Sequence, residues 1–80
     1  MKAGLKAKVT SRAVIQRINR KLAPDMEKLR TTRGERMQLE VGRYHVVDFG
    51  RNIITGVNID PEEMARALGV LEDYEEMVED

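Results

Sequence analysis

The clearest pattern of hydrophobic and polar positions lies in the second half of the chain, where two short runs are rich in β-branched and aromatic residues. These runs cover residues 44–49 and 52–59, and their composition is typical of half-buried β-strands. Gly50 and Asn52 tolerate a positive φ, so the pattern predicts a tight antiparallel hairpin over residues 44–59. Alternation with a period of two places three residues on the predicted core face: Ile53, Val57 and Ile59.

A short helix is predicted directly after this hairpin. Asp60 is a favourable N-cap residue, Pro61 fits the first helical position, and Glu63 completes a capping box. Gly69 suits the left-handed residue that ends a helix. Between these signals, apolar residues recur at helical spacing: Met64, Ala67, Leu68 and Leu71. The helix is short, so we expect packing on the hairpin to stabilise it.

An amphipathic helix is predicted near the start of the chain, with Thr10 or Ser11 as its cap. Its apolar stripe consists of Val14, Ile15, Ile18 and Leu22. Pro24 disfavours helix at the preceding residue but suits the first turn of a new helix, so we predict a kink or a restart there. Met26 and Leu29 then continue the stripe until a polar loop around Gly34.

Weaker patterns complete the predicted fold. Residues 37–41 alternate between apolar and polar positions and are predicted to add a strand, which makes the antiparallel sheet two- or three-stranded. Residues 1–10 form a basic N-terminal arm, either frayed or with an edge strand over residues 5–9. Residues 72–80 form an acidic tail, either frayed or an amphipathic helix. We therefore predict an α+β fold with one domain over residues 11–71.

Charge is distributed very unevenly, although the net charge of the 80 residues is zero. Residues 1–36 contain 11 Lys or Arg and 3 Asp or Glu, and residues 37–80 contain 3 and 11. A basic half can bind phosphates and an acidic half can bind basic protein surfaces. Alternatively, the two halves neutralise each other within the fold or across a dimer. The sequence leaves open which of these holds.

Catalytic, cofactor and metal sites are not indicated. His45 is the only histidine, there is no cysteine, and the spacing of the acids does not predict a metal cluster. Adjacent Glu62 and Glu63 cannot face each other on a helix, and no glycine-rich phosphate loop is present. No apolar run matches a membrane span or the core of a signal peptide. We expect a cytoplasmic protein that is not an enzyme and has no cofactor or membrane partner.

Basic side chains on the first helix and just after it are the candidate contacts with nucleic acid or with an acidic partner. They are Arg12, Arg17, Arg20, Lys21, Lys28, Arg33 and Arg36, with Arg30 among them in sequence. No helix-turn-helix spacing, zinc finger or RNA-stacking motif accompanies them, so sequence-specific recognition is not indicated. Nucleic-acid binding is therefore the alternative function.

Several segments resemble a group of short proteins of proteobacteria and their mobile elements. The resemblance rests on residues 16–22 (QRINRKL), 33–34 (RG), 44–48 (YHVVD) and 69–71 (GVL), and it spans residues 11–72. It implies a bacterial, cytoplasmic protein and no particular activity.

A small binding module is the function that we expect. An 80-residue chain with five methionines and three aromatic residues has a limited core, and it gains stability by sharing that core. An uncovered hairpin edge also invites another strand to pair with it. We therefore expect a protein-interaction or self-associating domain, with a homodimer or another protein as the partner.

Overall fold

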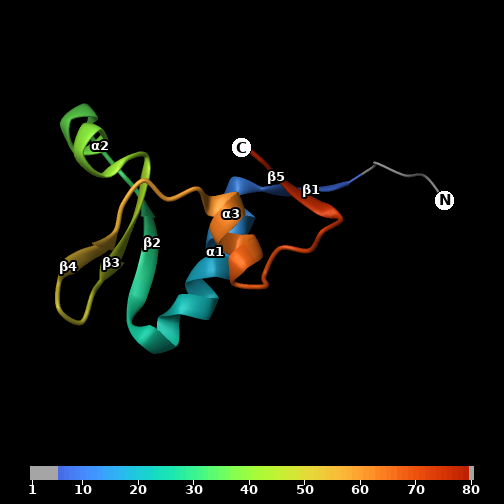
Figure 1. Cartoon of the computed structure of the whole chain (residues 1–80), viewed down its shortest axis with the longest axis horizontal. Coiled ribbons are helices and arrows are strands. Elements are labelled where there is room, and N and C mark those ends of the chain that lie inside the picture. The colour runs from blue at the N-terminus through green and yellow to red at the C-terminus, as the bar shows by residue number, and fades with distance from the viewer. Residues whose placement is uncertain (1–5, 80) are drawn as a thin grey trace.

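The computed structural model describes residues 6–79 and has an α+β architecture (Figure 1). A three-stranded antiparallel sheet in the order β2-β3-β4 lies at one end, and a parallel pair of strands, β1 and β5, lies at the other. The elements in chain order are β1 (Ala7–Thr10), α1 (Ser11–Leu22), the 3-10 turn η1 (Ala23–Asp25), β2 (Glu27–Thr31), α2 (Glu35–Val41), β3 (Tyr44–Asp48), β4 (Ile53–Gly56), α3 (Pro61–Ala67) and β5 (Glu75–Val78).

Helix α1 is the central element, and it forms where the apolar stripe predicts it. The Thr10 hydroxyl accepts a hydrogen bond from the Ala13 backbone N–H at 3.2 Å, so Thr10 is the N-cap. Val14, Ile18 and Leu22 are buried along one side of the helix. The stripe therefore packs on both the sheet and α3.

Pro24 ends the first helix and does not kink it, so the predicted kinked helix is wrong. After α1 the chain makes the turn η1, and Met26 then adopts a left-handed conformation with φ of 60°. A left-handed residue cannot continue a helix. The next segment is the strand β2, in which Leu29 is almost fully buried. Leu29 thus belongs to the core, but as a strand residue.

The hairpin is confirmed as strands β3 and β4, with its second strand ending at Gly56. Its third strand is β2, which pairs with β3 from Glu27↔Asp48 to Thr31↔Tyr44. Residues 37–41 are not a strand. Gly34 and Gly42 have φ of 87° and 85°, and they bracket the short helix α2.

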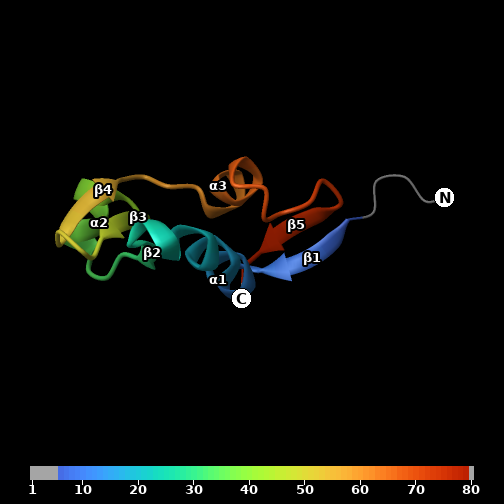
Figure 2. The same cartoon turned by 90° about the horizontal axis from the view of Figure 1, so that it is seen from below.

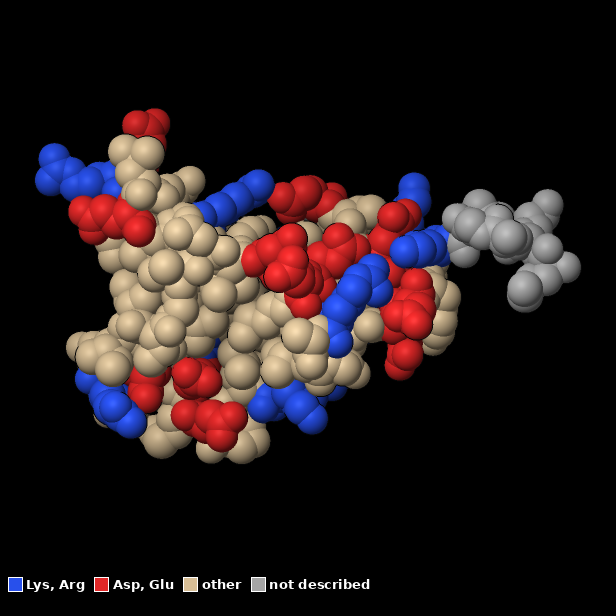
Figure 3. Space-filling model, viewed as in Figure 1, with Lys and Arg blue, Asp and Glu red and all other residues tan. Residues whose placement is uncertain are grey.

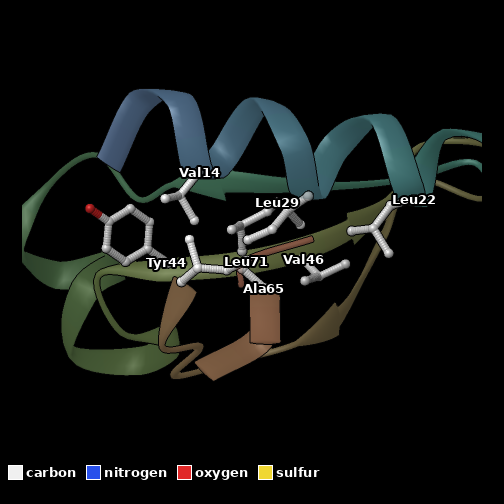
Figure 4. Packing of buried hydrophobic residues seen from close by; sticks show 8 residues of the cluster. Val14, Leu22, Leu29, Tyr44, Val46, Ala65 and Leu71 are labelled. Atoms are coloured by element: carbon white, nitrogen blue, oxygen red, sulfur yellow. The ribbon is translucent and has the colours of Figure 1, made fainter. Parts of the chain in front are cut away.

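The core lies between α1 and the inner face of the sheet, with α3 closing it (Figure 4). Val14 and Leu22 point from α1 toward Leu29 and Val46 of the sheet. Ile53 and Val57 were predicted to be core residues, but they are 45% and 47% exposed. The prediction is wrong for two reasons: Ile53 pairs with Asp48 at the turn end of the hairpin, and a bulge between Val46 and Val47 places Gly56, not Val57, opposite the buried Val46.

Helix α3 begins after the predicted N-cap, Asp60, and ends before the predicted glycine, Gly69. The Asp60 carboxylate accepts hydrogen bonds from the backbone N–H groups of Glu62 and Glu63. At the other end, the N–H of Gly69 donates to Arg66 and that of Val70 donates to Ala65, with Gly69 at φ 76°. This pair of bonds is a complete Schellman motif.

Strands β1 and β5 bring the first and last described segments side by side (Figure 2). The residues predicted as a basic arm and as an acidic tail thus pair in parallel, with Lys8 opposite Glu76. The tail forms a strand where a helix or a frayed segment was expected. The predictions for residues 1–5 and 80 concern residues outside the described range.

Candidate interaction surfaces

His45 has a structural role. Its Nδ1 lies 2.7 Å from the Thr32 hydroxyl, and both side chains are buried where α2 covers the sheet. Among residues 6–79, no three His, Cys, Asp or Glu side chains come together as metal ligands. No helix in the same range is long and apolar enough to cross a membrane.

Arg17, the central candidate on α1, is engaged within the chain. Its guanidinium donates to both carboxylate oxygens of Glu75 at 2.9 and 3.2 Å and to the Val70 carbonyl at 3.1 Å. The hydrogen bond from Arg17, together with one from the Glu72 backbone, lowers the pKa of Glu75 below its usual value. Arg17 therefore holds the acidic segment on α1.

Arg66 holds the same segment from the other side. Its guanidinium donates to the carbonyls of Glu72 and Glu75 at 2.9 and 2.7 Å and pairs with Glu62 at 3.2 Å. The Glu62 carboxylate in turn accepts from the Met77 backbone N–H at 2.9 Å. The basic and acidic halves are thus joined by Arg17 and Glu75, whereas Arg66 binds acidic residues of its own half.

Arg20 and Lys21 line a cleft of about 480 Å³ between α1 and the segment before β5. The opposite wall consists of Tyr74 and Glu72, and the paired side chains of Arg17 and Glu75 lie between the two walls. Charges of both signs meet in this cleft. It therefore offers little net attraction to a polyanion.

The remaining basic candidates do not join Arg20 and Lys21 in one face. Arg12 borders a separate hollow beside Tyr44. Lys28 lies on β2, Arg33 lies in the loop after β2, and Arg36 lies on α2. The candidates are therefore distributed over several surfaces.

A group of exposed apolar side chains at the sheet end is the largest feature that the sequence patterns did not identify. Ile53 and Val57, which lie on and just after β4, are 45% and 47% exposed, and we call these two residues the apolar end. Leu39 on α2 is 88% exposed, and Phe49 and Ile54, on the opposite face from Ile53, are 53% and 39% exposed. Figure 3 shows a broad area without charged side chains over β3, β4 and the segment that leads to α3. Many acidic side chains in this view lie over α3 and the last part of the chain, and others lie above and below the uncharged area.

The two edges of the sheet differ. The outer edge of β2 is covered by α1, because the Asn19 amide accepts from the Leu29 N–H at 2.7 Å and donates to its carbonyl at 3.1 Å. The outer edge of β4 pairs with no strand among residues 6–79. Residues 52–59 contain no charged side chain, so the usual protection of an open edge by Lys or Glu is absent.

The outer face of the sheet is apolar at its centre and basic at its side. Pairing of Lys28 with Val47, and of Val47 with Ile54, places these three side chains on one face. Arg30 shares this face, and with Lys28, Val47 and Phe49 it lines a hollow of about 340 Å³. We call Lys28, Arg30, Val47, Phe49 and Ile54 the open sheet face.

The acidic side chains nearest to this face, Glu27 and Asp48, are engaged in hydrogen bonds with other residues. Glu27 accepts a hydrogen bond from Thr55 at 3.0 Å, and Asp48 accepts from the N–H groups of Gly50 and Arg51 in the turn. The open sheet face could have been found from the alternation of Lys28, Leu29 and Arg30, a pattern that the helical interpretation of this segment concealed.

Comparison with known proteins gives no further guide to function. No protein-family model, no curated protein and no solved structure matches the chain.

Proposed function

We propose that this protein is a small non-enzymatic interaction module that binds a second copy of itself through the apolar end. The observation that carries the proposal is the contrast between the two sheet edges. Asn19 satisfies the backbone of Leu29 at the edge of β2, whereas the edge of β4 is open and flanked by exposed Ile53 and Val57. An open, uncharged edge is a template for another strand.

A second copy is the occupant that fits this edge best. Two β4 strands related by a two-fold axis pair in antiparallel fashion, and each copy then meets the same uncharged residues. The nearby charges do not oppose this contact, because Asp48 is 3.7 Å from Arg51 and Glu27 is bonded to Thr55. The bulge shortens the regular ladder, so we infer that the apolar side chains supply most of the association energy.

Sedimentation equilibrium over a concentration series around the micromolar range tests the proposal. We expect the wild-type chain to form a dimer and the Ile53→Lys variant to remain monomeric, because a lysine on an edge strand must lose its hydration when a second strand pairs with it. Tyr74→Lys is the matched control. Tyr74 is 64% exposed but lies in the cleft beside α1, so this variant should still dimerise.

A monomer at every concentration in the wild-type chain would refute the proposal. Dimerisation that survives Ile53→Lys but is lost in Tyr74→Lys would move the interface to the cleft. Circular dichroism of both variants checks that each one is folded. Exposed positions were chosen because substitutions there have small effects on stability.

A further inference from the structure

We propose that the open sheet face is a binding site for single-stranded nucleic acid. Lys28 and Arg30 would contact backbone phosphates, and a base would stack on Phe49 over the apolar floor. The site includes Lys28, one of the candidate contacts predicted from the sequence, and is separate from the candidates on α1. Pairing along the β4 edge extends the sheet within its own plane, so this inference does not depend on self-association.

The positive charge of this face favours an anionic partner. Lys28 and Arg30 are both exposed, and no acidic side chain lines the hollow between them and Phe49. Arg33 and Arg36 follow in the chain, so residues 28–36 carry four cations and a single acid, Glu35. On α1, by contrast, Arg17 is bound to Glu75, and the cleft beside Arg20 contains Glu72.

The spacing of the cations suits a regular polyanion. Residues two apart on a strand lie on the same side and about 7 Å from each other, so Lys28 and Arg30 form a short row along β2. A row of cations that follows a backbone is characteristic of proteins that bind single strands without sequence preference.

The apolar part of the face suits a base. Phe49 is 53% exposed, although it is the only phenylalanine of the chain and would be expected in the core. Its ring borders the same hollow as Val47, which is half-buried. Stacking of a base on an aromatic ring does not depend on which base is present, so one exposed ring can serve any sequence.

Duplex DNA fits this site poorly. Bases in a duplex are stacked on one another and cannot cover Phe49 without unpairing. The helical turn α2 lies beside the upper part of the sheet, where Gln38 approaches the Thr32 carbonyl at 3.4 Å. The exposed hollow is therefore short, and it matches a few nucleotides of a flexible strand.

Tryptophan fluorescence gives a local test, because the chain contains no tryptophan. We place the probe in the site with Phe49→Trp and in the cleft with Tyr74→Trp as the matched control. Each variant is titrated at low salt with a deoxythymidine oligonucleotide of about 12 residues. We expect saturable quenching in Phe49→Trp, and at most weak quenching in Tyr74→Trp.

Charge variants in the wild-type background test the phosphate contacts by fluorescence anisotropy of a labelled oligonucleotide. Lys28→Gln with Arg30→Gln should weaken binding at least tenfold and should reduce the slope of log K against log salt by about 1.4, since each lost phosphate contact removes about 0.7. Arg20→Gln with Lys21→Gln removes the same charge from α1 and should leave the slope within about 0.3 of its wild-type value. Phe49→Ala should weaken binding roughly 5- to 100-fold, and Phe49→Trp should not.

Four results would overturn the inference. They are no binding of the oligonucleotide at low salt, equal quenching by polyglutamate, equal affinity for a duplex of the same length, and a larger loss from the Arg20 and Lys21 variant than from the Lys28 and Arg30 variant. Equal quenching by polyglutamate would assign the face to acidic peptides. A larger loss from the Arg20 and Lys21 variant would place the phosphate contacts on α1. Thermal melting of each variant confirms that the fold is retained.

Discussion

Asn19 joins α1 to the edge of the sheet, and its removal should weaken the fold by a magnitude that the structure defines. The side-chain amide makes two hydrogen bonds to the backbone of Leu29, at 2.7 and 3.1 Å, and Leu29 is 1% exposed. Each bond contributes about 1 kcal/mol net, and Asn19→Ala therefore loses about 2 kcal/mol. Alanine is about 0.6 kcal/mol more favourable in a helix than asparagine, so the expected net loss is about 1.4 kcal/mol.

Thermal unfolding measured by circular dichroism checks this value. A loss of 1 kcal/mol lowers the Tm of a domain of this size by about 4–8 °C, so Asn19→Ala should melt about 6–11 °C below the wild-type chain. Gln16→Ala is the control, because Gln16 is exposed on the same helix. A difference between the two variants of less than about 0.5 kcal/mol in the free energy of unfolding would show that α1 is not attached to β2 through Asn19.

Three other predictions concern the ends of the fold. Asp60→Ala should lower the free energy of unfolding by about 1 kcal/mol in urea denaturation through loss of the N-cap of α3, without changing the dimer mass. Because the pKa of Glu75 is lowered in the folded chain, its contribution to stability is complete above the usual glutamate pKa of about 4.3 and is lost as the pH falls through the lower folded value. The Tm measured from pH 6 to 2.5 should therefore fall more steeply for the wild-type chain than for Glu75→Gln. Parallel curves would contradict the contact between Arg17 and Glu75. Gly42→Ala should destabilise the chain more than Gly69→Ala in urea denaturation. Both glycines have positive φ, so both substitutions introduce backbone strain. A Cβ at position 42 would also lie 2.8 Å from the Asn58 Cα, whereas nothing lies within 4 Å of a Cβ at position 69.

Local signals in the sequence predicted the elements that depend on neighbouring residues. The Asp60 cap, the Gly69 stop and the stripe from Val14 to Leu22 act within one or two turns of helix, so the residues that decide them are adjacent in the chain. The hairpin was predictable for the same reason. Its turn has Asn52 at φ 61°, the conformation that asparagine tolerates.

Elements that depend on distant residues were not predictable in this way. Residues 26–29 continue the apolar period of α1, yet β2 forms because β3 offers it a complete ladder and buries Leu29. Residues 75–78 begin with two glutamates, a residue type that is common in helices and tails. A strand forms here because β1 pairs with it and because Arg17 binds Glu75. The partners of residues 75–78 are more than 50 residues away in the sequence, and Arg17 and Glu75 are separated by 58 residues.

The difference between local signals and distant partners also explains which candidate surfaces the sequence could indicate. The sequence pattern indicated basic residues on α1 and just after it as one set of contacts, because it shows which charges are present and not which are paired. The structure assigns Arg17 to Glu75 and leaves Lys28 and Arg30 on a face without acids. The exposure of Phe49 and Ile53 was not predicted, because their residue types predict burial and both residues lie at the turn end of the hairpin.

The response of the dimer to salt separates two explanations of self-association. If oppositely charged halves of two copies attract each other, raising the salt concentration from about 0.05 to 0.5 M should weaken the dimer, because screening acts over about 10 Å at 0.1 M. We expect no weakening. Arg17 and Arg66 already bind the acidic segment within their own chain, and residues 52–59 at the proposed interface carry no charge. Binding of single strands to the open sheet face should show the opposite behaviour and decline steeply over the same range. A dimer that dissociates in parallel with the nucleic-acid complex as salt rises would place charged groups at the interface and refute the assignment to the apolar end.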